Sequence, residues 1–176
     1  MIFLFRRAQF GLGVKWLCAF MVCAFFGLPG HAEEIPILAI SGEVERPLLL
    51  SAKQLRDMNH VTATVSEHNG LVSDYQGVPL VSLLGSAGLA FGKALRGKRL
   101  TTYLLVGARD GYAVVFALPE LDPAFNDRKI FLAYSKKGVA LPDEEAPLRV
   151  IIPDEKREAR WIRQVVTLKV ISTGSR

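Results

Sequence analysis

The chain has 176 residues, half of them hydrophobic, and a formal net charge of +5 from 22 basic and 17 acidic side chains. Residues 1–32 contain three of the basic residues, none of the acidic ones and both cysteines, so residues 33–176 carry 19 basic and 17 acidic residues. This near balance excludes a nucleic-acid binder driven mainly by phosphate neutralisation. Because residues 33–176 lack cysteine, disulfides, thiolate metal sites and a cysteine nucleophile are also excluded there.

Residues 1–32 have the pattern of a secretory signal peptide. After a basic start, the apolar run at 16–28 is shorter than the roughly 20 residues that a membrane-spanning helix needs, and small residues follow it. We therefore expect cleavage before Glu33, a single domain over residues 33–176 and, in a cell with two membranes, a periplasmic location. A pair of arginines in the basic start leaves the general and twin-arginine export routes open, and an uncleaved anchor is the alternative.

After this segment, short apolar runs alternate with turn residues. The expected strands are 35–40, 48–50, 61–65, 101–108, 113–117, 130–134, 148–152 and 165–171. Ser51 and Gln54 form a capping box that opens a short helix, and Pro79 suits the start of a buried helix that ends at Gly88. The polar stretch 66–77 is expected to connect two elements. Together these patterns predict an α+β domain with a mostly β core and short helices.

Segment 155–164 is charged, permits a helix, and contains Trp161 between Arg160 and Arg163. Three residues apart on a helical turn, the two arginines would share a face. A tryptophan beside guanidinium groups could stack on a flat heterocycle while an arginine donates to its carbonyl or to a phosphate. The alternative is that Trp161 belongs to the core and the arginines are solvated.

Other combinations of reactive residues have no defined spacing. His60 and His68 are potential metal ligands. Glu67 or Asp74 could supply a third ligand, but nothing in the sequence places these side chains together, so no metal site is predicted. The acidic run 143–145 is interpreted as a solvated loop. The sequence has no serine-hydrolase or phosphate-loop motif, and no catalytic residue is predicted.

Five segments of the sequence are each weak evidence for a family, but their order and spacing together are fairly specific. They are Tyr75-Gln-Gly-Val-Pro-Leu80 with Leu83-Leu84, Arg109-Asp-Gly-Tyr112 with Phe116, Phe131-Leu-Ala-Tyr134, Pro147-Leu-Arg-Val-Ile-Ile-Pro153 and Arg160-Trp-Ile-Arg-Gln-Val165. In this order they resemble the molybdopterin-binding domain of the sulfite oxidase family. The resemblance covers nearly all of residues 35–171. It implies the sulfite-oxidase-like α+β fold, with a pterin cleft formed by loops around the sheets.

The chain departs from the enzymes of this family at the metal. In those enzymes a cysteine thiolate upstream of the Gly-Val-Pro-Leu segment holds molybdenum, whereas residues 62–68 of this chain contain no cysteine. Hydroxyl groups or a histidine are poor replacements for a soft thiolate. The resemblance is therefore closer to the small stand-alone secreted members, some of which are similar to periplasmic pterin-binding regulators (PruR-like).

That closer resemblance implies a protein that binds a reduced pterin without a metal. It also implies a ligand sensor for a membrane cyclic-di-GMP enzyme, a diguanylate cyclase/phosphodiesterase with a periplasmic sensing domain. Two alternatives stay open: a molybdopterin-dependent oxidoreductase with an unusual non-cysteine metal site, and a degenerate scaffold with an empty cleft.

A pterin presents an exocyclic amine and a ring N–H side by side, and a carboxylate can accept both. Asp110 is the first candidate for this role and Glu67 the second, although Asp110-Gly111 equally fits a hairpin turn. The pterin carbonyl suits an arginine, and the ring face suits an aromatic side chain. The candidate pterin-binding residues are Trp161, Arg160, Arg163, Asp110, Tyr112, Tyr75, Glu67 and His68.

Overall fold

The computed structural model describes residues 34–173, and the predicted signal peptide lies outside them. Within the described range, no helix is long and apolar enough to cross a membrane. The strands are β1 (Pro36–Gly42), β2 (Leu48–Ser51), β3 (Val61–Ser66), β4 (Val72–Pro79), β5 (Thr102–Ala108), β6 (Ala113–Ala117), β7 (Phe131–Lys136), β8 (Val139–Ala140), β9 (Arg149–Ile151) and β10 (Val165–Ser172). The helices are α1 (Ala52–Asp57), α2 (Leu80–Ser86) and α3 (Leu118–Leu121), and the 3-10 turns are η1 (Gly92–Ala94), η2 (Gly97–Thr101) and η3 (Glu158–Arg160).

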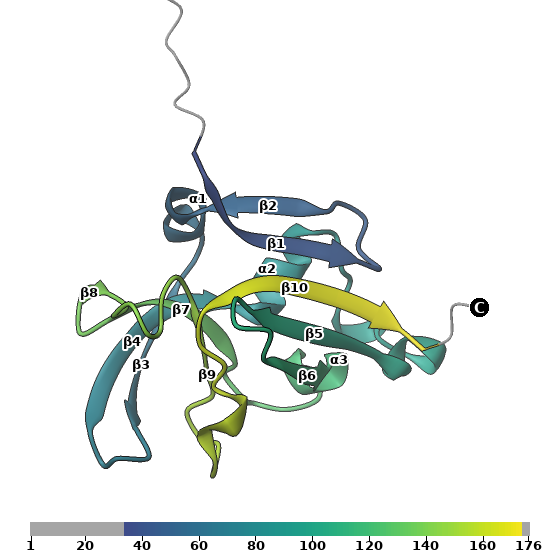
Figure 1. Ribbon diagram of the computed structural model, residues 1–176. Coiled ribbons are helices and arrows are strands. Elements are labelled where there is room, and N and C mark those ends of the chain that lie inside the picture. The colour runs from purple at the N-terminus through teal and green to yellow at the C-terminus, as the bar shows by residue number, and fades with distance from the viewer. Residues whose placement is uncertain (1–33, 174–176) are drawn as a thin grey trace, which may run out of the picture. The chain divides into compact units, whose positions relative to one another are not determined.

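The strands form two sheets (Figure 1). The first has the order β2-β1-β10-β5-β6, and the second has the order β3-β4-β7-β8 with β9 also paired to β7. Only the pairing of β1 with β10 is parallel among the described strands. The last described strand, β10, therefore lies in the middle of the first sheet. Two mostly antiparallel sheets with short helices confirm the predicted α+β class with a mostly β core.

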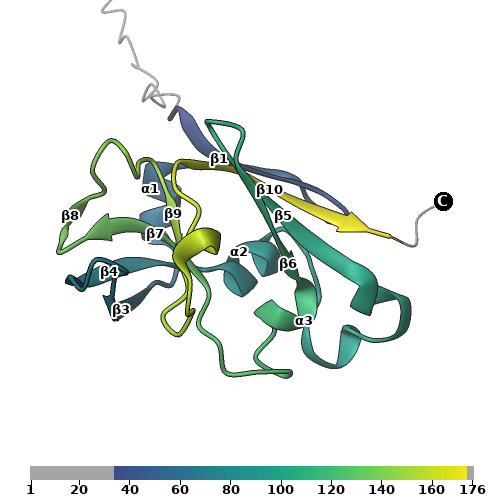
Figure 2. The same cartoon turned by 60° about the horizontal axis from the view of Figure 1, so that its bottom comes forward.

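One hydrophobic core joins both sheets, and α2 lies between them (Figure 2). Strand β5 alternates buried and partly exposed residues, with Leu104 and Val106 fully buried, as expected for a strand with one face on the core. Helix α2 buries Leu80, Leu83 and Leu84 completely, so its apolar spacing identifies the face that packs on the core.

The helix starts follow the sequence closely. The Ser51 side chain accepts the backbone N–H of Gln54, and the Gln54 side chain accepts the backbone N–H of Ser51, so the predicted capping box is present at α1. Pro79 is the last residue of β4 and the residue before α2, which begins at Leu80 and ends two residues before Gly88. The predicted buried helix is therefore confirmed, with its first residues belonging to β4.

The predicted connection at 66–77 is wrong, because most of it belongs to β4 and to the hairpin that β4 forms with β3. The buried face of β4 carries Ser73 and Tyr75, which are 2% and 0% exposed, so the apolar alternation that marks a strand is missing from the sequence. Gly77 also lies on this strand, where a Cβ atom would stand 2.2 Å from the carbonyl oxygen of Leu132. A larger residue would force β4 away from β7.

Candidate functional site

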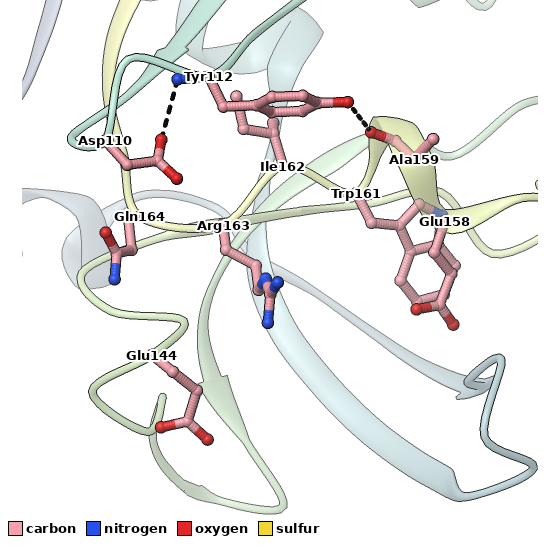
Figure 3. A pocket seen from close by; sticks show the side chains of 9 residues that line it. All are labelled: Asp110, Tyr112, Glu144, Glu158, Ala159, Trp161, Ile162, Arg163 and Gln164. Carbon is pink, nitrogen blue, oxygen red and sulfur yellow. Dashed lines mark hydrogen bonds between the residues drawn. The ribbon is translucent and has the colours of Figure 1, made fainter.

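A pocket of about 470 Å³ opens where three connecting segments meet (Figure 3). The segments are the turn between β5 and β6, the loop before β9, and residues 158–164, which lead into β10. The lining residues are Asp110, Tyr112, Glu144, Glu158, Ala159, Trp161, Ile162, Arg163 and Gln164. Four candidates from the sequence lie in this pocket, namely Asp110, Tyr112, Trp161 and Arg163, whereas Arg160, Tyr75, Glu67 and His68 do not line it.

Segment 158–164 is not the helix that the sequence permits. Only the short 3-10 turn η3 forms, and the residues after it form backbone hydrogen bonds with β9 and with the loop before β9. The Val150 N–H donates to the Ile162 carbonyl at 2.9 Å, and the Gln164 N–H donates to the Glu145 carbonyl at 3.0 Å. These tertiary hydrogen bonds hold the segment after η3 against β9 and the loop before it, and the segment forms one wall of the pocket.

Arg160 and Arg163 therefore do not share a helical face. The Arg160 guanidinium forms ion pairs with Glu120 and Glu155, at 2.8 and 2.7 Å, and it lies 5.1 Å from the ring centroid of Phe116. Burial alone would lower the pKa of Arg160, but hydrogen bonds with both carboxylates raise it. Arg163 is exposed and faces the pocket (Figure 3).

Asp110 lies in the tight turn between β5 and β6. One of its carboxylate oxygens accepts the backbone N–H of Tyr112 at 2.9 Å, and Gly111 between them has a φ of 86°. Asp110 therefore stabilises the hairpin turn and lines the pocket at the same time, so the two interpretations of Asp110-Gly111 are compatible. The Tyr112 hydroxyl donates to the Ala159 carbonyl at 3.0 Å, which ties this turn to η3 (Figure 3).

Trp161 is both a core residue and part of the pocket wall. The residue is 3% exposed, and the Arg149 guanidinium lies 5.5 Å from its ring centroid. Its indole Nε1 is buried and has no hydrogen-bond partner among the described residues. Most buried tryptophan N–H groups find an acceptor, so this one is an unused donor beside a pocket.

The pocket lining carries more negative than positive charge. Asp110, Glu144 and Glu158 contribute carboxylates, and Arg163 contributes the only cation of the lining. Glu144 and Arg163 are exposed and form no hydrogen bond or ion pair with any residue between 34 and 173. These polar groups are therefore free to meet a ligand.

Glu158 is the exception, because both of its carboxylate oxygens have partners. One oxygen accepts the backbone N–H of His68, and the other lies 3.5 Å from the Arg149 guanidinium. The side chain of His68 itself is exposed, so the contribution of this candidate to the site is through its backbone.

Glu67 and Tyr75 belong to a separate cluster, which we call the buried network. It consists of Glu67, Tyr75, Lys136, Glu145 and Arg149. The Tyr75 hydroxyl donates to Glu67 at 3.2 Å and accepts from Arg149 at 2.9 Å. Lys136 lies 2.8 Å from Glu67, and Arg149 lies 2.8 Å from Glu145. Tyr75 has no exposed face for stacking on a ligand.

The charges of the buried network stabilise one another. Burial alone would raise the pKa of the Glu67 carboxyl, but hydrogen bonds and the positive charge of Lys136 lower it below its usual value. Burial alone would lower the pKa of Lys136, but its contacts with Glu67 and Tyr75 raise it above its usual value. Both groups are therefore ionised at neutral pH.

Glu144 and Glu158 are pocket residues that sequence reasoning missed. Glu144 lies in the acidic run interpreted as a solvated loop, and the run is indeed exposed at Asp143 and Glu144. The signal that could have identified Glu158 is its position two residues before Arg160, in a segment already considered for a ligand. His60 is exposed, and the described residues contain no group of three or more His, Cys, Asp or Glu that could hold a metal ion.

Comparisons with known proteins agree with this fold. The family described as "Oxidoreductase molybdopterin binding domain" matches residues 34–175. The crystal structure of the sulfane dehydrogenase SoxCD from Paracoccus pantotrophus is similar, with a TM-score of 0.60 and 22% sequence identity over 79% of this chain and 39% of that chain. This chain thus spans well under half of that structure, and the likeness shows the fold alone. A search of curated proteins gives no match. The family match covers most of the sequence, and the chain belongs to the oxidoreductase molybdopterin-binding domain family.

Proposed function

We propose that this protein binds a reduced pterin without molybdenum and acts as a periplasmic sensor that regulates a membrane cyclic-di-GMP diguanylate cyclase/phosphodiesterase. The observation that carries the proposal is Trp161, which lines the pocket while its buried indole N–H has no hydrogen-bond partner among the described residues. An unsatisfied buried donor costs about 1–3 kcal/mol. A ring nitrogen or carbonyl of a ligand in the pocket would satisfy it.

The remaining lining suits the polar edge of a pterin. The exocyclic amine and the ring N–H next to it are both donors. The Glu144 carboxylate and the Asp110 carboxylate oxygen that does not accept from Tyr112 are acceptors. The pterin carbonyl is an acceptor, and Arg163 is the exposed donor of the lining. Tyr112 is 50% exposed and offers an aromatic face. A neutral, flat heterocycle rich in donors matches this set.

A complete molybdenum cofactor fits these residues poorly. The phosphate of molybdopterin carries negative charge, and it would face three carboxylates. Glu158 among them lies 3.5 Å from the Arg149 guanidinium, and Arg163 is the one cation of the lining itself. Residues 33–176 contain no cysteine to supply the thiolate that molybdenum requires in the enzymes of the family. The charge of the lining thus supports a pterin without phosphate or metal over the oxidoreductase alternative.

A sensor needs a route from the pocket to a surface that a partner can contact, and Glu158 supplies one. It lines the pocket and also accepts the backbone N–H of His68 at the tip of the β3–β4 hairpin. Leu71 and Val72 at this tip are 56% and 60% exposed. A ligand that competes for the Glu158 carboxylate would release the hairpin tip, which supports signalling by ligand occupancy.

Calorimetric titration with tetrahydrobiopterin under anaerobic conditions tests pterin binding. Arg163→Gln should weaken affinity by about 10- to 100-fold, because a charge-assisted hydrogen bond contributes roughly 1.5–3 kcal/mol. Arg157→Gln removes an exposed cation of the same segment outside the pocket lining and should leave affinity unchanged. Equal affinity of both variants would place the pterin elsewhere, and no binding by the parent protein would refute the proposed ligand.

The regulatory role has its own readout. In a strain that lacks this protein, we expect cellular cyclic-di-GMP to stop responding to pterin supply. The Arg157→Gln protein should restore the response and the Arg163→Gln protein should not. A strain whose cyclic-di-GMP concentration is unchanged by the deletion would contradict the sensor role while leaving pterin binding intact.

A further inference from the structure

One end of the first sheet carries a concentration of positive charge that the pterin proposal does not use. Between Tyr75 and Arg109 the sequence has no acidic residue, and four basic residues occur within seven positions. They are Lys93, Arg96, Lys98 and Arg99, and we call them the basic face. Because residues 33–176 are nearly balanced in charge overall, this segment is a local departure and not a consequence of composition.

Lys93 lies on η1, Lys98 and Arg99 lie on η2, and Arg96 directly precedes η2; none of these charges is neutralised by an ion pair among the described residues. All four side chains are exposed, and within residues 34–173 none forms an ion pair. The buried Leu95 between them is 2% exposed and anchors the segment to the core. Arg99 shares a small cavity with Glu43, but the two do not approach within ion-pair distance.

The carboxylate of Asp122 is nearby but already used. It accepts the backbone N–H of Gly92 at 2.6 Å and that of Ala124 at 2.9 Å. Asp122 therefore stabilises the backbone of η1 and of the loop after α3, and it forms no ion pair with any described cation. This contact also fixes the loop that carries Phe125 against η1.

Two exposed apolar side chains accompany the cations. Leu100 follows Arg99 directly and is 42% exposed, and Phe125 on the loop held by Asp122 is 50% exposed. Cations next to exposed apolar side chains suit a lipid interface, where the cations meet anionic headgroups and the apolar groups enter the acyl boundary. A nucleic-acid phosphate backbone or an acidic polysaccharide offers no apolar phase for Leu100 to enter, so this side chain would add little to the affinity for either.

We infer that the basic face binds the surface of a membrane that contains anionic lipids. The basic face precedes β5, and the Asp110 turn of the pocket follows β5. Strand β5 has seven residues, and at a rise of roughly 3.3 Å per residue its two ends, and hence the two sites, lie about 20 Å apart. A protein docked through the basic face thus keeps its pocket away from the headgroups. The inference depends on charge and exposure alone and does not require the pterin proposal.

Co-sedimentation with vesicles tests this inference. The parent protein should bind vesicles of phosphatidylcholine mixed with phosphatidylglycerol more tightly than vesicles of phosphatidylcholine alone, and salt should weaken the difference. Replacing the four cations of the basic face by glutamine should weaken binding about fivefold per charge, or several hundredfold in all. Leu100→Ser should weaken it by a smaller factor at unchanged charge.

The matched control removes the same charge elsewhere, through Arg56→Gln, Lys137→Gln, Lys156→Gln and Arg157→Gln, all at exposed positions. All proteins are purified in the same form, so that residues 1–32 contribute equally. We expect the control to bind the mixed vesicles like the parent protein. An equal loss of vesicle binding in the control would show that binding depends only on the net charge of the protein, and this would overturn the inference. Binding to heparin or to an RNA oligomer, without preference for the anionic vesicles, would overturn it as well.

Discussion

Glu144 and Glu145 are neighbours in the chain, but their carboxylates lie in two different regions. Glu144 is exposed, lines the pocket and forms no ion pair with a described residue. Glu145 is 6% exposed, lies 2.8 Å from the Arg149 guanidinium and belongs to the buried network. The pocket and the buried network therefore use the same residue types under opposite conditions. A charged side chain is available to a ligand where the fold leaves it without a partner.

The largest effect on stability that tests this comparison is expected from substitution of Arg149. Arg149→Met would remove the nearer cation of the buried Glu145, leaving Lys136 at 3.5 Å, and would leave Tyr75 without its donor. Breaking a buried ion pair costs about 3–5 kcal/mol, so we expect a loss of that size in the free energy of unfolding, measured by urea denaturation. Arg163→Met in the pocket should change it by less than about 0.5 kcal/mol. Similar losses in both variants would show that the two regions do not differ in this way.

Trp161 belongs to both regions, because it lines the pocket and lies beside Arg149 of the buried network. Trp161→Phe keeps most of the buried apolar area but removes the indole N–H, which has no partner within residues 34–173. If a ligand accepts from this N–H, the affinity for tetrahydrobiopterin should fall about two- to tenfold. Titration of the folded variant measures this. Unchanged affinity would assign Trp161 to the core alone, the alternative that the sequence left open.

The smallest expected effect is on the pH dependence of stability. The pKa of Glu67 in the folded protein is lowered by its partners, so its contribution to stability is fully present above its unfolded value of 4.5 and is lost as the pH falls through the folded pKa. Glu67→Gln should therefore be less stable than the parent protein at about pH 7, and the difference should shrink towards about pH 3.

Glu144→Gln is the control for this titration, because it removes an exposed carboxylate that has no ion pair among the described residues. We expect its unfolding free energy to follow that of the parent protein at both pH values. A Glu67→Gln variant that behaves like this control would contradict a stabilising role for the buried network.

The sequence predicts most of the strands because their burial alternates with their hydrophobicity. Strand β5 is an example, with its apolar residues Leu104 and Val106 on the core side. Strand β4 was missed because the buried network requires polar side chains on its inner face. Tyr75 there meets Arg149, which is 74 positions away in the chain. A contact over that distance leaves no periodic pattern in the sequence.

The same reasoning explains what could be predicted of the site. Asp110 and Tyr112 sit in a tight turn whose Asp-Gly pair is visible in the sequence. Glu144 reaches the pocket because its loop pairs with segment 158–164, through the hydrogen bond between the Gln164 N–H and the Glu145 carbonyl. The helix that the sequence permits at 155–164 is reduced to η3 for the same reason, since tertiary hydrogen bonds outweigh a permissive local sequence.

The central claim is that the pocket holds a pterin without molybdenum. The most direct test isolates the protein from the cells that produce it, then measures molybdenum by elemental mass spectrometry and released pterin by fluorescence in the same sample. We predict bound pterin at a substantial fraction of the protein concentration and molybdenum at background. Near-equimolar molybdenum, together with turnover of an oxidisable or reducible substrate, would contradict this account and establish the oxidoreductase alternative.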